Sequence, residues 1–313
     1  MKSIRLNIFI SLACTCLVFA QNDIHSEDIL ILNDSIQLPG ILTYNPDSTP
    51  TTLAIFIQGS GNPDRNGNQL AMNVKANYIK QLAESLFTKN IAMFRYDKRN
   101  VPVANHKYVF VHYKFEDLVD DVETIIEFFK MDARFNKIVL IGHSQGSLVG
   151  MLAANSGADR FVSLSGLSKT ADEAIVWQLS KQNQGLSEVA AAHFKELKET
   201  GEIKDPNPFL ISIFAKANLE FLRSYMMYDP TEVIKSLNIP VLILNGDKDL
   251  QVPVDDAEAL HSACPDATLQ IIPNMNHVLK HLVEDTDNMK SYFSPDYPVS
   301  EDLIQSLVSF IKQ

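Results

Sequence analysis

Short runs of apolar residues alternate with amphipathic stretches along most of the chain. Continuous apolar runs of this length are typical of strands that are buried on both faces of a parallel sheet. Residues 29–57 indicate strands interrupted by turns at Asn33-Asp34 and Pro39-Gly40. The buried strands are predicted at residues 53–57, 91–94, 137–141, 161–164, 241–244 and 268–272.

Between these runs, apolar residues recur at helical spacing. Helices are predicted over residues 73–88, 115–129, 147–154, 255–263 and 301–311. Because strand and helix alternate, right-handed βαβ units should build a mostly parallel sheet with helices on both faces. The predicted fold class is therefore α/β.

Residues 168–236 interrupt this alternation. They are helical in character and lie between two core strands, where about a dozen residues would suffice for a crossover. We therefore expect a helical cap inserted into the domain. Most of its large apolar residues should pack against each other, and some should line an apolar acyl pocket. They are Trp177, Leu179, Phe194, Phe209, Phe214, Phe221, Tyr225, Met226 and Met227.

The first twenty residues have the pattern of a secretory signal. Lys2 and Arg5 precede an apolar run over residues 8–19, and Ala20 ends a small-residue cleavage site. We expect residues 1–20 to be removed, residues 21–313 to form the folded domain, and the protein to be periplasmic or extracellular. The alternatives are a buried N-terminal strand or an uncleaved anchor, but the run is short for a membrane span.

Composition narrows the class of protein. Of 313 residues, 46% are hydrophobic and 21% charged, which is typical of a globular chain and not of a disordered one. Three cysteines, of which only Cys264 lies beyond the predicted signal, exclude a disulfide-built miniprotein. The net charge of −11 gives no electrostatic basis for binding phosphate backbones, so no nucleic-acid partner is expected.

The segment Gly142-His143-Ser144-Gln145-Gly146 directly follows one predicted strand and precedes a helix. G-x-S-x-G in this context is typical of a nucleophile elbow. The turn is so tight that side chains at the two glycine positions would collide with the neighbouring strand and helix. Ser144 is therefore the predicted nucleophile, and the other interpretation is a glycine-rich turn with a chance serine. His143 is too close in the chain to reach across to the Ser144 hydroxyl.

A serine nucleophile needs a general base that is oriented by an acid, in the chain order serine, acid, histidine. Asp247 and Asp249 both follow the strand at 241–244. We favour Asp249 as the acid, because the Asn245-Gly246 turn must reverse before a side chain can point back over the sheet. Asp247 would then cap the turn.

The predicted general base is His277, in the loop after the strand at 268–272. His281 is its competitor and is expected one turn into a short helix. The two histidines are four residues apart, but no H-E-x-x-H motif or third ligand accompanies them, so no metal is expected. No cofactor is expected either.

The negative oxygen of the tetrahedral intermediate needs backbone N–H donors that are fixed in advance. One should be the amide of Gln145, the residue after the nucleophile. The other should come from the loop Gln58-Gly59-Ser60-Gly61, where we favour the amide of Ser60. The alternative for this loop is an ordinary glycine turn.

With these elements in order, residues 28–313 resemble the α/β-hydrolase superfamily. The segment Gln58-Gly-Ser-Gly-Asn-Pro-Asp-Arg-Asn-Gly67 is similar to the G-S-G-x-x-D-R-[DN]-G loop of a bacterial esterase group related to dienelactone-hydrolase-like and acyl-transferring proteins. Arg95-Tyr-Asp-Lys-Arg99 is similar to that group's R-Y-D-K-R-G stretch, with Asn100 in place of the final glycine. The resemblance implies a triad of the residues that match Ser144, Asp249 and His277.

Within these two segments, four charged residues are expected to form one ion-pair network that anchors the loops. They are Asp64, Arg65, Asp97 and Arg99. Gln58 stands where many hydrolases have a histidine. The resemblance implies that only the backbone is essential at this position.

The sequence therefore predicts a secreted serine hydrolase that cleaves small-molecule carboxylic esters through an acyl-enzyme, without a stable membrane anchor. An acyltransferase or a peptidase with the same triad is the alternative. A binding protein without activity is a third interpretation, although such a protein should have lost a triad member. Acyl group, alcohol and oligomeric state stay open.

Overall fold

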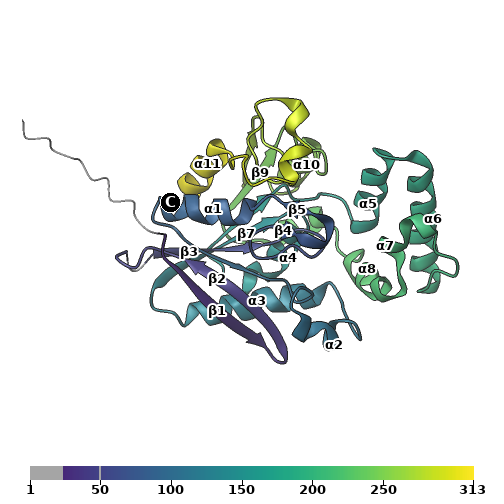
Figure 1. The fold of residues 1–313 in the computed structure, drawn as a ribbon, viewed down its shortest axis with the longest axis horizontal. Helices are drawn as coiled ribbons and strands as arrows, with labels where there is room; N and C mark the ends of the chain where they lie inside the picture. Colours follow the sequence, from purple (N-terminus) through teal and green to yellow (C-terminus); the bar gives the residue numbers. More distant parts are fainter. Residues whose placement is uncertain (1–23, 49–50) are drawn as a thin grey trace, which may run out of the picture.

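The computed structural model describes residues 24–48 and 51–313, so the predicted signal lies outside the described residues. Its centre is an eight-stranded sheet in the order β1-β2-β6-β3-β7-β8-β9-β10 (Figure 1). The strands are β1 (Ser26–Asn33), β2 (Ile36–Thr43), β3 (Thr51–Ile57), β6 (Ala92–Tyr96), β7 (Phe135–His143), β8 (Arg160–Leu164), β9 (Val241–Gly246) and β10 (Thr268–Ile272).

The sheet is antiparallel at one edge and parallel elsewhere. β1 and β2 form a hairpin, and β2 also pairs antiparallel with β6. From β6 to β10 all neighbours are parallel. Consequently the loops that follow β3, β7, β9 and β10 all leave the same edge of the sheet, which is where functional groups gather in open α/β sheets.

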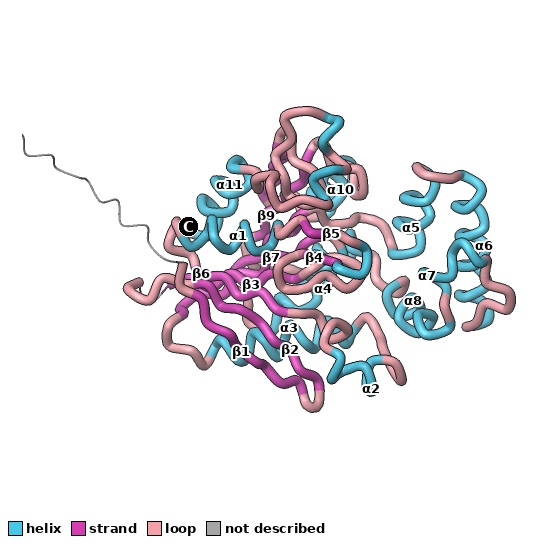
Figure 2. The backbone as a smooth tube through the Cα atoms, viewed as in Figure 1, coloured by secondary structure: helices cyan, strands magenta, loops and turns pink. Residues whose placement is uncertain are grey.

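Helices cover both faces of this sheet, as Figures 1 and 2 show. α3 (Glu116–Lys130), α4 (Gln145–Ala153) and α10 (Val254–Ala263) bury their apolar sides in one core, whereas α1 (Tyr78–Phe87) and α11 (Glu301–Ile311) bury theirs in the other. Strand residues alternate between the two cores with the period of a pleated strand. In β3, Leu53 and Ile55 face the first core and Phe56 faces the second.

Between β8 and β9 the chain forms a helical insertion, residues 165–240, which lies beside the sheet in Figure 1. It packs through aromatic side chains. Phe194 contacts Phe214 edge-on, with the ring centroids 4.8 Å apart, and Tyr225 stacks on Phe115 of the main body, with the ring centroids 4.4 Å apart. The fold class predicted from the sequence, including the helical cap insertion, is confirmed. The insertion contains α5 (Ala171–Ser180), α6 (Gln184–Thr200), α7 (Ile211–Phe214), α8 (Leu219–Tyr225) and α9 (Pro230–Val233).

The helix predicted over residues 73–88 begins too early. Asn73 and Asn77 adopt left-handed backbone conformations, with φ of 56° and 50°, which asparagine tolerates and a helix cannot continue through. The residues before α1 instead form a small ribbon, β4 (Asn68–Gln69) with β5 (Val74–Lys75). A further short helix, α2 (His106–Val109), precedes α3.

The predicted short helix at His281 is also wrong. His281 forms an isolated bridge with Met275, and its amide donates to the Pro298 carbonyl at 3.0 Å. None of the helices in the described residues is both long enough and apolar enough to cross a bilayer.

Candidate active site

Ser144 sits on the sharp turn between β7 and α4. Its backbone, with φ 55° and ψ −123°, is a strained conformation for a residue other than glycine. A Cβ atom on Gly142 would lie 2.4 Å from the Gly146 carbonyl oxygen, and one on Gly146 would lie 2.2 Å from that of Ile57. Because both obstacles are main-chain atoms, the turn can close only with glycine at these positions.

His277 and Asp249 meet at the carboxyl ends of β10 and β9. The Nδ1 of His277 lies 2.8 Å from the Oδ2 of Asp249. The other Asp249 oxygen accepts the amides of Gln251 and Val252, at 2.8 and 2.9 Å. Burial alone would raise the pKa of the Asp249 carboxyl, but His277 and the two amides together hold it below its ordinary value. The ionised carboxylate therefore keeps the proton on Nδ1 and leaves Nε2 as the basic nitrogen.

The competing acid and base are placed elsewhere. Asp247 is exposed, and its Oδ1 accepts the amide of Asn274 at 2.7 Å, which ties together the two loops after β9 and β10. His281 is held by its bridge to Met275 on the far side of the same loop. Of the four candidates, only Asp249 and His277 are brought together.

His143 joins the elbow to the histidine loop, a contact that sequence analysis missed. Burial, with the neighbouring His277, lowers the pKa of His143 to about 3, so its ring is neutral. Its Nε2–H donates to the main-chain carbonyl of His277 at 2.8 Å. The ring therefore fixes the loop that carries His277 relative to Ser144. The only sequence signal for this role is its place inside the elbow motif.

The loop after β3 lies directly against the elbow. A Cβ atom on Gly59 would lie 3.1 Å from the Cβ of Ser144 and 3.4 Å from the carbonyl oxygen of His143, which shows how closely this loop approaches the elbow. The amides expected to bind the oxyanion, those of Ser60 and Gln145, donate to no main-chain carbonyl within the described part of the chain. They remain available to a ligand at the serine.

A buried lysine connects these two amide-bearing segments. The Nζ of Lys98 donates to the Gly59 carbonyl at 3.0 Å and to the Oε1 of Gln145 at 3.1 Å. Lys98 follows β6 and is 4% exposed. Sequence analysis quoted this lysine within a motif but assigned it no role. Its position between two predicted catalytic loops becomes visible only in three dimensions.

Only part of the loop-anchoring ion-pair network predicted for the charged motif residues forms, because Arg65 and Asp97 pair with each other whereas Arg99 pairs with other residues. Arg65 pairs with Asp97 at 2.7 Å and so fastens the loop after β3 to the end of β6. Arg99 instead binds Asp121 of α3, at 2.7 Å. Asp64 pairs with no arginine in the described residues; its carboxylate accepts main-chain amides within its own loop.

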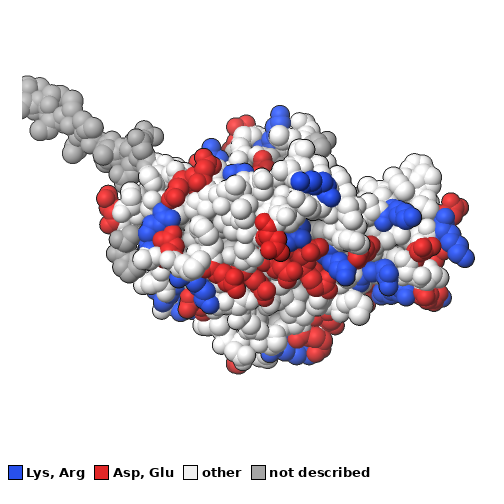
Figure 3. Space-filling view, turned by 90° about the horizontal axis from the view of Figure 1, so that it is seen from below, with Lys and Arg blue, Asp and Glu red and all other residues white. Residues whose placement is uncertain are grey.

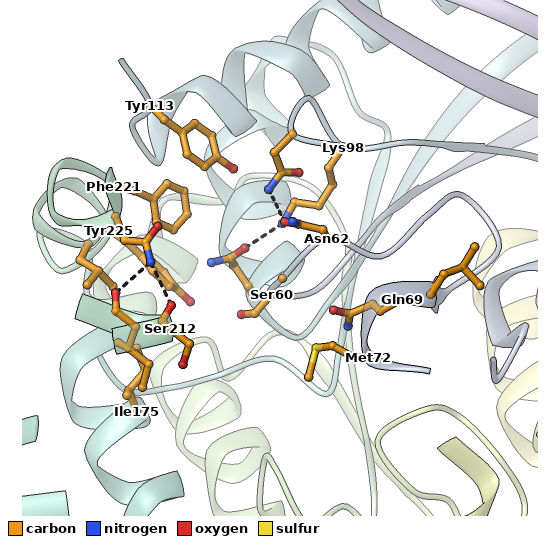
Figure 4. Close-up of a pocket in the computed structure, with 17 residues that line it drawn as sticks. Ser60, Asn62, Gln69, Met72, Lys98, Tyr113, Ile175, Ser212, Phe221 and Tyr225 are labelled. Atoms are coloured by element: carbon orange, nitrogen blue, oxygen red, sulfur yellow. Dashed lines mark hydrogen bonds between the residues drawn. The ribbon is translucent and has the colours of Figure 1, made fainter. Parts of the chain in front are cut away.

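Two cavities adjoin at this edge of the sheet. Ser144 and His277 line the smaller one, of about 280 Å³. The larger, about 510 Å³, lies between the loop after β3 and the helical insertion (Figure 4). The two share wall residues, and of the large cap residues expected to form a pocket, Phe221 and Tyr225 line the larger cavity. The shared residues are Ser60, Gln69, Met72, Ile175 and Tyr225.

No group of three or more potential metal-ligating side chains is found in residues 24–48 and 51–313. The chemistry available at this site is therefore that of a strained serine, a histidine paired with a carboxylate, and free main-chain amides. Such a set can support nucleophilic attack on a carbonyl and stabilise the oxyanion that forms.

The chain is similar to several known proteins. The BD-FAE family model matches residues 41–264. The esterase EstD of Thermotoga maritima is 25% identical over 250 residues, which cover 77% of this chain and 58% of that protein, so this chain spans under two thirds of that curated relative.

Solved structures agree in fold. The esterase Pf2001 of Pyrococcus furiosus superposes with a TM-score of 0.60 at 16% identity, covering 93% of this chain and 91% of that one. Est1E from Butyrivibrio proteoclasticus superposes with a TM-score of 0.55 at 17% identity, covering 91% of this chain and 99% of that one. At these identities the likeness establishes the α/β-hydrolase fold alone.

Proposed function

This chain belongs to the BD-FAE family, and we propose that it hydrolyses carboxylic esters with Ser144 as nucleophile, His277 as general base and Asp249 as the acid that orients His277. The observation that carries the proposal is the hydrogen bond between His277 and Asp249, at 2.8 Å, beside a cavity that Ser144 also lines. EstD, which is named an esterase, supports the same reaction class.

The reaction begins when the Ser144 hydroxyl attacks the ester carbonyl and His277 Nε2 accepts its proton. The negative charge that develops on the carbonyl oxygen is stabilised by the amides of Ser60 and Gln145. The imidazolium of His277, stabilised by the Asp249 carboxylate, then donates its proton to the leaving alcohol. Water attacks the acyl-enzyme by the same route in reverse and releases the acid.

The two cavities suggest how the ester lies. The leaving alcohol must be near His277, which protonates it, and His277 lines only the smaller cavity. Ser60, Gln145 and Phe221 line the larger cavity, and His277 is not among its lining residues. The larger cavity therefore receives the acyl group, whereas the alcohol leaves through the smaller cavity.

The nucleophile is tested by Ser144→Ala. Turnover of short 4-nitrophenyl esters should fall by roughly 10⁴-fold or more, and covalent labelling by a fluorophosphonate probe should disappear. Ser262→Ala, at an exposed serine in α10, is the matched control and should label and react like the parent protein. Persistent labelling of Ser144→Ala would refute the assignment.

Two parts of the proposal need separate measurements. Export is tested by fractionating cells and sequencing the N-terminus of the recovered protein, which should begin at Gln21. Hydrolysis is distinguished from acyl transfer by product analysis with added alcohols and amines, because transfer would yield new esters or amides in place of the free acid.

A further inference from the structure

Lys98 is a buried cation with an incomplete set of partners. Its side chain is 4% exposed, and its ammonium donates to two neutral acceptors, the Gly59 carbonyl and the Gln145 side chain. An ammonium has three donors, so one is left over. Within the described residues Lys98 forms no ion pair, unlike its neighbour Arg99, which is paired with Asp117 and Asp121.

The larger cavity, which Lys98 lines, contains no acidic side chain. Lys98 donates to the Gln145 side chain from the cavity wall, and Figure 4 shows Asn62, Tyr113 and Tyr225 around the same space. Burial raises the pKa of both tyrosines, which keeps their hydroxyls neutral. The protein as a whole carries a net charge of −11, and Figure 3 shows acidic side chains gathered across one face. Among the described residues that line the cavity, Lys98 is the one that carries a charge, and its charge is opposite in sign to that of the protein as a whole.

A buried ammonium without a counter-ion is energetically unfavourable, because it has lost its hydration without gaining a charged partner. Desolvation lowers the pKa of Lys98 to about 8 although the charge of Asp121, which is paired with Arg99, partly opposes this, so Lys98 is still mostly protonated at neutral pH. A negatively charged ligand group in the cavity would supply the missing partner and the third acceptor together.

We propose that the larger cavity is an acyl subsite for esters whose acyl group carries a free carboxylate, which Lys98 recognises. This rests on the proposed ester hydrolysis and on the placement of the acyl group in this cavity. A single cation surrounded by amides and hydroxyls balances one negative charge, whereas a doubly charged phosphate would leave excess charge in a buried site. Asn62 and Ser212 in the cavity wall carry further neutral side-chain donors for the carboxylate, whereas the amide nitrogen of Asn218 already donates to the carbonyls of Ser212 and Ile213.

The test compares two esters that differ in one charge: the 4-nitrophenyl monoester of glutaric acid and the same ester with its free carboxylate methylated. The parent protein should have a kcat/KM about 10- to 100-fold higher for the charged ester, as expected for one charge-assisted hydrogen bond. In Lys98→Met this ratio should fall to about one or below, and in Lys98→Arg it should be largely retained. Lys89→Met, which removes an exposed lysine, should keep the parent ratio.

The ratio isolates recognition from any general loss of rate, since Lys98 also contacts the segments that carry the oxyanion amides. A parent protein that prefers the methylated ester overturns the subsite, whatever the variants do. So does an unchanged ratio in folded Lys98→Met. If the parent protein hydrolyses neither ester nor any short neutral ester, and a fluorophosphonate does not label it, the proposed function itself has failed. Activity on neutral esters alone refutes only the subsite.

Discussion

Two regions of the molecule are packed differently. One is the edge of the sheet that carries Ser144, Asp249 and His277 (the catalytic edge), and the other is the helical insertion. At the catalytic edge, main chains lie in direct contact: the Gly146 position lies against the Ile57 carbonyl, and the Gly142 position lies against the Gly146 carbonyl. In the insertion, side chains make the contacts, as in the stack of Tyr225 on Phe115. There the glycine of α6, Gly185, meets no atom closer than 3.4 Å from an added Cβ.

The difference indicates that the two regions have different roles. Main-chain contacts leave no room for adjustment, which suits a nucleophile and amides that must be held to within a fraction of an ångström. Side-chain packing can be changed by substitution while the helices persist, which suits a surface that decides which acyl group fits. We therefore expect changes at the catalytic edge to affect chemistry or folding severely, and equivalent changes in the insertion to have small effects.

The largest effect is expected at Asp249, the proposed catalytic acid. Asp249→Asn keeps the shape of the side chain but allows the wrong tautomer of His277, so kcat should fall on the order of 10⁴-fold. Asp247→Asn is the matched control, because it keeps an acceptor for the Asn274 amide, and should lose less than tenfold. Steady-state kinetics with a short 4-nitrophenyl ester measures both. A larger loss in Asp247→Asn would reverse the assignment of the acid.

The next effect contrasts two glycines. Gly146→Ala forces a Cβ against the carbonyl oxygen of Ile57 and should reduce the free energy of unfolding by about 3 kcal/mol or more. Gly185→Ala introduces a better helix former whose Cβ meets only the Asn183 side chain, at an ordinary contact distance of 3.4 Å, and should be neutral or stabilising by up to about 1 kcal/mol. Urea denaturation followed by circular dichroism gives both values. Equal costs at the two glycines would remove the distinction between the regions.

A smaller effect is expected from pH. The pKa of His143 is about 3 in the folded protein, against an ordinary value of 6.5, so below pH 6.5 the unfolded chain binds a proton that the folded chain does not. Stability should therefore decrease as pH falls, by about 1.4 kcal/mol per pH unit. Between pH 6.5 and 4.5, above the range where the lowered pKa of Asp249 matters, His143→Gln should lack this contribution of about 2–3 kcal/mol.

The control for this measurement is His112→Gln, which removes an exposed imidazole and should leave the profile parallel to that of the parent protein. If His143→Gln shows the same dependence as the parent protein, His143 is not the buried neutral group that links the elbow to the histidine loop.

The strands and the elbow could be predicted because their signals are local. A continuous apolar run identifies a strand buried on both faces, and the glycines of G-x-S-x-G reflect collisions within one turn. The turn at Asn245-Gly246 was also enough to favour Asp249, which is the acid that meets His277. The catalytic roles of these residues are still predictions, but the geometry that the roles require could be anticipated from short segments.

What could not be predicted depends on contacts between distant segments. Lys98 lies among charged residues and would ordinarily be exposed, yet its two partners, 39 and 47 residues away in the chain, bury it. Asn73 and Asn77 fit a helical pattern, but Asn73 lies between the two strands of the ribbon and Asn77 lies directly before α1, and their left-handed conformations have no signature in hydrophobic periodicity. Phe221 and Tyr225 line the larger cavity because of how α8 docks, which no spacing in the sequence specifies.

The contacts of Lys98 have a consequence for how selectivity should be expressed in kinetics. One ammonium touches both segments that carry the oxyanion amides and also faces the space assigned to the acyl group. A substrate group that binds the ammonium would also affect the position of these two segments in the transition state. Differences between acyl groups should therefore be seen in kcat rather than in the binding affinity of the ground state. Poor substrates would then occupy the site and act as slow competitors of good ones.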